Sequence, residues 1–179
     1  NAVRFASAFF GKGQFEPEQF EQTGNVYTFR QELRGSYYQP ILDPSLKPIA
    51  PEDYSRSRSL REQSNICHLR YEAKIIDKET MFEMHISATG TEHVPLAIEI
   101  NLAEGGIIQG ATPSPAIQET FLFNDEVVVY TVNGDSIRIG PGHNEHAYTQ
   151  VRGSLPKFPG PSLYLTGYTP FNHVLTFEL

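Results

Sequence analysis

The sequence contains no tryptophan, and it has only one cysteine, Cys67, among its 179 residues. A single cysteine excludes an intramolecular disulfide. The fold therefore has to be stabilised by a hydrophobic core, which a chain of this length can bury. Cys67 falls in an alternating apolar pattern beside Leu69 and Tyr71. This position predicts a buried structural thiol, because a catalytic thiolate needs exposure and a nearby base.

Long apolar runs are missing as well. No segment approaches the roughly 18 apolar residues that a transmembrane helix needs. Residues 1–4 lack the charged start and apolar stretch of a signal peptide, and the sequence does not begin with methionine. We interpret it as a mature or excised piece of a protein, and we expect a secreted or periplasmic, bacterial-type location.

Basic residues are outnumbered, with 14 Lys and Arg against 21 Asp and Glu, and the formal net charge is −7. This balance argues against a general nucleic-acid binder and against binding to anionic membranes. The densest positive charge is Arg56, Arg58 and Arg61, within a Pro/Arg/Ser-rich segment at about 36–65. This segment is interpreted as a solvated loop, or alternatively as a lid or rim whose arginines grip a carboxylate or sulfate.

The abundant signals are those of β-structure. Apolar and polar residues alternate through 67–75, 82–88 and 96–102, which predicts an antiparallel meander of three strands with one buried face. In the segment 127–139, Asn133-Gly134 separates two β-rich runs. This dipeptide predicts a type I′ hairpin, because that turn needs positive φ at both central residues.

The whole chain contains at least ten such strand signals and no convincing long helix. Its many phenylalanines and tyrosines favour strands, and its 14 glycines and 13 prolines favour turns. We therefore predict one all-β domain spanning residues 1–179, an antiparallel β-sandwich of the supersandwich or jelly-roll-like kind.

The first group of candidate site residues follows the hairpin. His143 and His146 lie just past Gly140-Pro141-Gly142, with Glu145 between them. Imidazole and carboxylate groups at this spacing could hold a divalent metal, with Glu99 or His173 as a further ligand. The alternative is that these histidines hydrogen-bond loop backbone. No other cofactor is expected.

A second group is a set of polar residues on predicted strands. Glu99 and Asn101 share one face, which is either a sugar-binding surface or an ordinary solvent face. Tyr148 and Arg152 share a face of the strand predicted at 147–151. His173 follows an aromatic segment in which Tyr164, Tyr168 and Phe171 are either a platform for sugar rings or core residues. No nucleophile elbow is present, so serine-hydrolase chemistry is not expected.

An ordered set of short motifs runs through the second half of the chain. It comprises Gly90, residues 94–99, Gly105-Gly106, Gly134-Asp135, Gly140-Pro141-Gly142, His146-Ala147-Tyr148, Arg152-Gly153, Thr166 and residues 169–173. This order resembles the C-terminal β-sandwich of heparinase II/III-like polysaccharide lyases, over about residues 90–179. In that family most of the chemistry lies in a helical toroid and a central sandwich, so the resemblance implies a non-catalytic, carbohydrate-associated module.

A partial resemblance to cupins involves Gly134-Asp135, Pro141-Gly142 and His143, with His146 as an additional imidazole. The proline stands one position late, and no upstream His-x-His pair is present. Two main hypotheses follow. The first is an accessory, non-catalytic module of a polysaccharide-degrading enzyme. Its partner would be a carbohydrate, including an acidic polysaccharide, or the rest of a larger enzyme. The second is a small cupin-like or mutarotase-like enzyme that uses His143, His146 and Glu99. A pure packing domain is the third reading.

Overall fold

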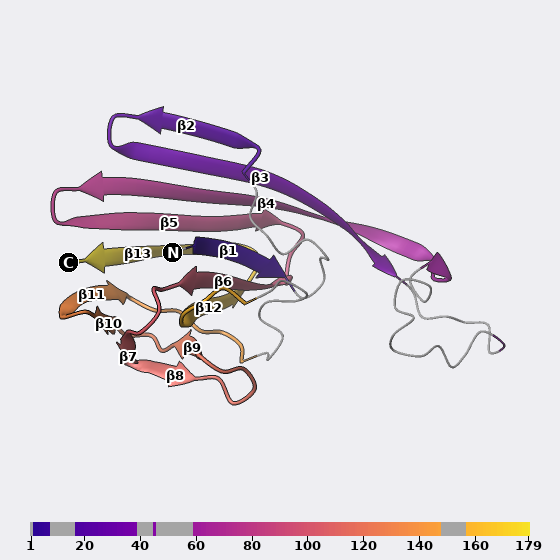
Figure 1. Ribbon diagram of the computed structural model, residues 1–179. Helices are drawn as coiled ribbons and strands as arrows, with labels where there is room; N and C mark the ends of the chain where they lie inside the picture. The colour runs from indigo at the N-terminus through magenta and orange to yellow at the C-terminus, as the bar shows by residue number, and fades with distance from the viewer. Residues whose placement is uncertain (1, 8–16, 39–44, 46–58, 148–156) are drawn as a thin grey trace.

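The computed structural model describes residues 2–7, 17–38, 45, 59–147 and 157–179 (Figure 1). These residues form thirteen strands and almost no helix, which confirms the predicted all-β class. The strands are β1 Ala2–Ser7, β2 Gln19–Thr23, β3 Val26–Tyr38, β4 Gln63–Lys78, β5 Met81–Gly90, β6 Pro95–Asn101, β7 Ile107–Gln109, β8 Ala111–Pro113, β9 Thr120–Phe123, β10 Val128–Val132, β11 Asp135–Gly140, β12 Ser162–Tyr168 and β13 Phe171–Glu178.

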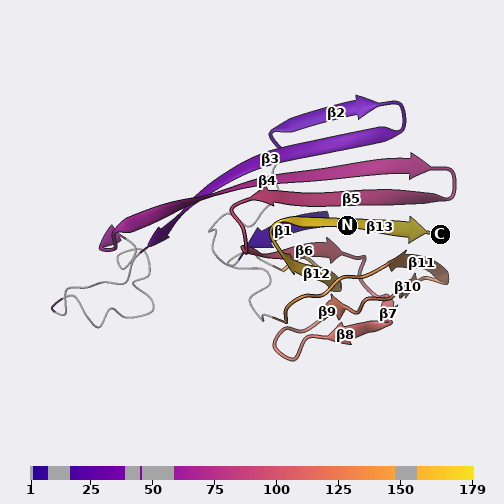
Figure 2. The ribbon, with the colours of Figure 1, turned by 180° about the vertical axis from the view of Figure 1, so that it is seen from behind.

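The strands form two sheets. One has eight strands in the order β2-β3-β4-β5-β13-β11-β10-β7, and the other has five in the order β1-β6-β12-β9-β8. Figures 1 and 2 show the two sheets from opposite sides, with β2 at the edge of the large sheet and the ends of β3 and β4 extending far beyond the smaller sheet. All pairings are antiparallel except that of β12 with β9.

The inner faces of the two sheets share one hydrophobic core. Leu69, Ile86 and Leu175 reach it from the large sheet, and Ile98 and Leu165 reach it from the small one. Each of these side chains is at most 2% exposed. Because side chains of a strand alternate between its faces, the residues between them face outward. The sandwich is therefore held together by the burial of alternate residues.

The predicted meander is wrong in its third strand. β4 and β5 do pair, from Leu69 opposite Gly90 to Lys78 opposite Met81. β6 instead lies in the other sheet, between β1 and β12. All seven of its residues are buried. The alternation in its sequence separates two buried faces, one apolar and one partly polar, and it does not reveal which sheet the strand joins.

The hairpin prediction is confirmed. β10 and β11 pair antiparallel, with Val132 opposite Asp135, so that the loop consists of Asn133 and Gly134. Their φ angles are 54° and 91°, both in the positive region that a type I′ turn requires.

The loop predicted at 36–65 is flanked by strands that extend into it, because β3 continues through Tyr38 and β4 begins at Gln63. Arg56 and Arg58 lie outside the described residues, and Arg61 is exposed. Cys67 lies in β4, but its side chain is not among those described. The strand predicted at 147–151 also falls outside the described residues, apart from residue 147. In the described part of the chain, no helix has the length and apolarity to cross a membrane.

A glycine at the end of β5 provides a test of this packing. Gly90 has a φ of +119°, and a Cβ there would clash with the carbonyl oxygen of His68. We predict that Gly90→Ala lowers the free energy of unfolding by about 3 kcal/mol, because backbone strain and the clash add. Gly24→Ala is the control, since Gly24 has a φ of +60° with open space around it, and it should cost only about 1 kcal/mol. Urea denaturation measures both; equal losses would contradict the described β4–β5 contact.

Candidate functional site

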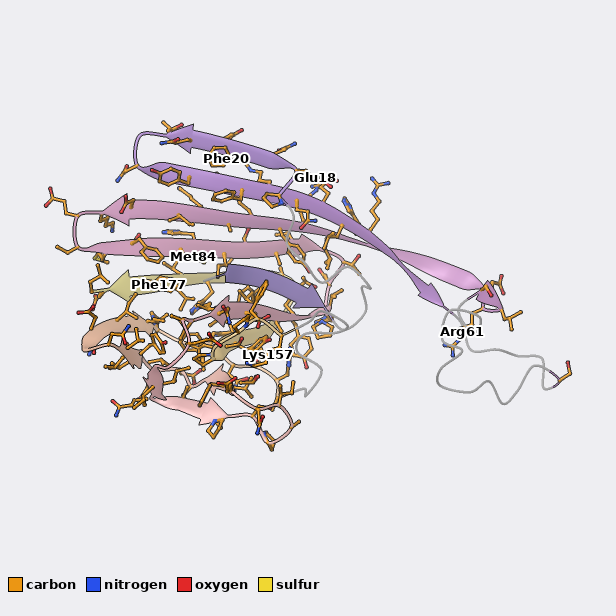
Figure 3. All side chains as sticks on the ribbon, viewed as in Figure 1. Glu18, Phe20, Arg61, Met84, Lys157 and Phe177 are labelled. Atoms are coloured by element: carbon orange, nitrogen blue, oxygen red, sulfur yellow. The ribbon has the colours of Figure 1, made fainter. Side chains whose placement is uncertain are left out.

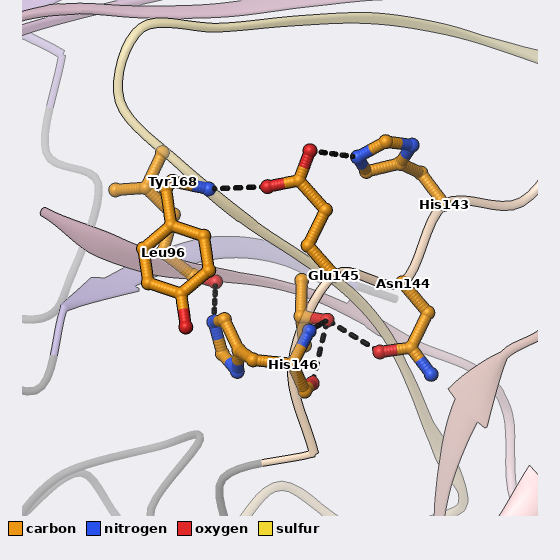
Figure 4. A network of polar contacts seen from close by, with 7 residues as sticks. Leu96, His143, Asn144, Glu145, His146 and Tyr168 are labelled. Carbon is orange, nitrogen blue, oxygen red and sulfur yellow. Dashed lines mark hydrogen bonds and ion pairs between the residues drawn. The ribbon is translucent and has the colours of Figure 1, made fainter. Parts of the chain in front are cut away.

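The loop that follows β11 is fixed to the small sheet by β12. The backbone N–H of Glu145 donates to the carbonyl of Thr166 over 3.1 Å, and the N–H of Thr166 donates to the carbonyl of His143 over 3.2 Å. The hydroxyl of Thr166 also donates to Oδ1 of Asn144 over 2.6 Å. This loop therefore has a defined geometry although it is not a strand (Figure 4).

Glu145 occupies the centre of a small polar cluster. Its Oε1 lies 3.0 Å from Nε2 of His143. Its Oε2 accepts a hydrogen bond of 3.0 Å from the backbone N–H of Tyr168. The His143 ring centroid lies 5.4 Å from that of His173. The side chains of His143 and Glu145 are 34% and 43% exposed, so protons can exchange with solvent at this pair.

His173 reaches the cluster from β13. Its Nε2 lies 2.8 Å from the carbonyl oxygen of Pro141. Because a carbonyl only accepts, Nε2 carries the proton. Burial lowers the pKa of His173, the bond to Pro141 acts in the opposite direction, and the nearby His143 lowers it further. The neutral imidazole is therefore favoured at this position.

His146 lies on the other side of Glu145, and its ring points away from His143 (Figure 4). Its Nε2 donates to the carbonyl oxygen of Leu96 over 2.9 Å, and its ring packs edge-on against Tyr168, with centroids 5.2 Å apart. Burial lowers the pKa of His146, and hydrogen bonds to backbone partly oppose this shift. The contacts of His146 are those of a residue that joins the loop to β6.

Glu99 and Asn101, both on β6, each bond a partner outside this cluster. Oε1 of Glu99 accepts a hydrogen bond of 2.6 Å from the hydroxyl of Ser162. The side-chain amide of Asn101 donates to the carbonyl of Pro159 over 3.0 Å. Glu99 is 2% exposed and Asn101 is 6% exposed, so neither side chain lies on an open surface. The structure thus brings together His143, Glu145 and His173, and it places Glu99 and Asn101 elsewhere.

The remaining predicted site residues lie either outside the described part of the chain or largely in the core. Tyr148 and Arg152 lie outside the described residues. Tyr164 and Phe171 are 0% and 3% exposed and belong to the core, while Tyr168 is half-buried. Within the described ranges, no group of three or more His, Cys, Asp or Glu side chains has an arrangement that could hold a metal ion. A metal at His143 and His146 stays a prediction.

A groove on the outer face of the large sheet is a second candidate site, which sequence reasoning missed. It has a volume of about 500 Å³ and is lined by residues of β3, β4 and β5, together with Glu18 and Gln19 at the start of β2. Most of its lining side chains are polar, and the main ones are Glu18, Arg30, Glu32, Arg70, Glu72, Ser87 and Thr89. The alternation of charged residues in β3 and β4 is visible in the sequence, but only the strand register places these charges side by side.

Two sets of ion pairs cross the strands in this groove. Nε of Arg30 lies 2.6 Å from Oε2 of Glu72. Nε of Arg70 lies 3.0 Å from Oε1 of Glu32, whose other oxygen lies 3.0 Å from Nε2 of His68. The hydrogen bond to Glu72 raises the pKa of Arg30, and the hydrogen bond to His68, followed by that to Arg70, lowers the pKa of Glu32. The groove therefore presents charged donors and acceptors at neutral pH.

Comparisons of this chain with protein-family models, with curated proteins and with solved structures found no match. The resemblances to heparinase II/III-like lyases and to cupins accordingly stay predictions.

The lowered pKa of His173 predicts a pH dependence of stability. Because its folded-state pKa lies below the ordinary value of 6.5, the unfolded chain binds a proton first as the pH falls. Stability should therefore be complete above about pH 7 and decrease as the pH falls through about 6.5 towards the lowered folded-state pKa of His173. His173→Asn should make this decrease shallower, as measured by urea unfolding at several pH values.

The control for this prediction is His93→Asn, because His93 is exposed and its φ of 58° is one that asparagine tolerates. It should leave the pH profile of the free energy of unfolding unchanged. A His173→Asn profile that coincides with that of the unsubstituted chain would contradict the described burial of His173.

Proposed function

We propose that this chain is a carbohydrate-associated, non-catalytic β-sandwich module that binds a saccharide in the groove of the large sheet. The observation that carries the proposal is the row of paired charged side chains across β3 and β4. Sugar hydroxyls both donate and accept hydrogen bonds. Arginine supplies donors in a planar fork and glutamate supplies acceptors, and hydrogen bonds to charged groups are stronger than neutral ones.

The charges of the groove indicate which kind of saccharide it would take. Three glutamates, Glu18, Glu32 and Glu72, line it together with two arginines, Arg30 and Arg70. Both arginines already pair with glutamates. An acidic polysaccharide would meet an excess of negative charge, whereas a neutral saccharide would meet donors and acceptors that are already positioned. We therefore propose a neutral saccharide.

The wider setting of the proposal comes from sequence resemblance. As an accessory module of a polysaccharide-degrading enzyme, the domain would hold substrate beside a catalytic unit elsewhere in a secreted or periplasmic protein. The exposed groove is consistent with this role, because a long saccharide could lie along the sheet face and continue past either edge.

Arg70→Ala tests the groove, because the Arg70 side chain is 65% exposed and its loss removes a fork of donors. We predict that binding to a neutral polysaccharide weakens about tenfold, equivalent to about 1.4 kcal/mol for lost charge-assisted hydrogen bonds. Affinity electrophoresis in gels that contain soluble glucan, mannan or xylan measures the change in retardation.

Lys74→Ala is the matched control, since Lys74 lies on the same strand and face as Arg70 but outside the groove lining. It should leave retardation unchanged. If none of the neutral polysaccharides retards the chain, saccharide binding in this groove is wrong. If only acidic polysaccharides do so, the neutral class is wrong.

A second candidate function is acid–base catalysis on a sugar ring by a mutarotase-like or cupin-like enzyme. The observation that favours it is the contact of 3.0 Å between His143 and Glu145, with His173 beside them. A histidine and a carboxylate within hydrogen-bond reach can share a proton with a bound substrate. In this structure the candidate relies on these three residues. Glu99 is buried in its network with Ser162, and His146 is bonded to backbone.

This second candidate predicts that the chain accelerates the interconversion of sugar anomers. Polarimetry of a freshly dissolved anomer should show a faster approach to equilibrium than buffer alone. Glu145→Gln should reduce the acceleration by about 100-fold, the lower range for a general acid–base group. Glu104→Gln is the control, because Glu104 is exposed and lies beyond the end of β6 opposite to Leu96, the residue that contacts His146. A rate equal to that of buffer would remove this candidate.

A further inference from the structure

An apolar cavity of about 380 Å³ lies between the two sheets, at the end of the sandwich where β13 finishes. Its walls come from β5, β6, β10, β11 and β13 and from the residues just after β6. Figure 3 labels two of the wall residues, Met84 and Phe177, on the neighbouring strands β5 and β13. The cavity is therefore built from both sheets and is separate from the groove on the outer face.

The walls of the cavity are suited to a flat apolar ligand. Phe82 and Phe177 stack with ring centroids 4.2 Å apart and an interplanar angle of 11°, so they form a flat aromatic pair. Met84 beside them is 5% exposed and has a flexible, polarisable side chain that adapts to ligand shape. Val132 and Ile137 supply aliphatic surface from the β10–β11 hairpin.

The polar groups around the cavity select against negative charge in the ligand. Tyr130 donates its hydroxyl to the carbonyl oxygen of Ala103 over 2.5 Å, so that hydroxyl is already used. Asp135 is exposed and lies on the same hairpin. The residues described around the cavity include no lysine, arginine or histidine. A carboxylate or sulfate on a ligand would meet the Asp135 carboxylate and no compensating cation.

We propose that this cavity is a binding site for a small, uncharged, apolar molecule that contains a planar ring. Its volume lies within the range of roughly 300–1,000 Å³ that is usual for small-molecule sites. Its composition, a mainly apolar wall with a few polar groups, is also usual for such sites. The site is independent of saccharide binding, because none of its lining residues is shared with the groove.

The test uses two fluorescent probes that are similar in size and differ in charge. Phenylnaphthylamine is uncharged, and anilinonaphthalene sulfonate is an anion. We expect the full 179-residue chain to bind the uncharged probe saturably, with one site per chain, and to bind the anion at least about tenfold more weakly. Absence of saturable binding of the uncharged probe to the folded chain would overturn the proposal.

Two substitutions in the same strand locate the binding. Val132→Phe fills the cavity and should weaken binding of the uncharged probe at least about tenfold. Val129→Phe adds the same volume on the opposite face of β10 and should leave binding unchanged. Circular dichroism checks that both variants fold. Equal binding by a folded Val132→Phe variant would show that the probe sits elsewhere, and the proposal would fail.

A third substitution decides the question even if Val132→Phe does not fold. Asp135→Lys changes an exposed residue and reverses the charge beside the cavity. It should tighten binding of the anionic probe at least about tenfold. The affinity for the uncharged probe should change by no more than about twofold. If the anion gains nothing, the probe is not bound beside Asp135 and the assignment is wrong.

Discussion

The whole structure depends on β6 and β12, two internal strands of the small sheet whose side chains are buried on both of its faces. Every residue of β6 is buried, and all but the last residue of β12 are buried. Because side chains alternate, a shift of one residue would exchange Ile98 in the core with Glu99 on the outer face. That exchange would place a carboxylate among apolar side chains, so a one-residue shift in the register of these two strands is excluded.

The candidate sites are consequences of this register. The loop with His143 and Glu145 is fixed because Thr166 of β12 accepts and donates backbone hydrogen bonds to it. β13 follows β12 after a short turn and crosses to the large sheet, where it pairs with β5 and β11. This crossing brings His173 next to His143. A loosely fixed β12 would separate the imidazoles, so the chemistry of the cluster depends on the packing of the core.

Part of the candidate site was predictable from the sequence, and part was not. His143, Glu145 and His173 are conspicuous as polar residues at strand ends, but their proximity requires the adjacency of β11 and β13. Glu99 interrupts an apolar run and was interpreted as surface-facing. It is buried because the outer face of the small sheet is covered as well, with Ala97, Leu122 and Tyr164 in a second buried cluster there. The groove was missed because each charged strand face, taken alone, has the pattern of an ordinary solvent face.

Local chemistry determined the all-β class, the alternation of each strand and the Asn133-Gly134 hairpin, because these features depend on neighbouring residues and on turn geometry. Tertiary structure alone decided which sheet β6 joins, which polar residues meet and where space remains between the sheets. These depend on pairings between segments far apart in the chain. A period of two identifies a strand and its two faces, but it carries no information about the partner on either side.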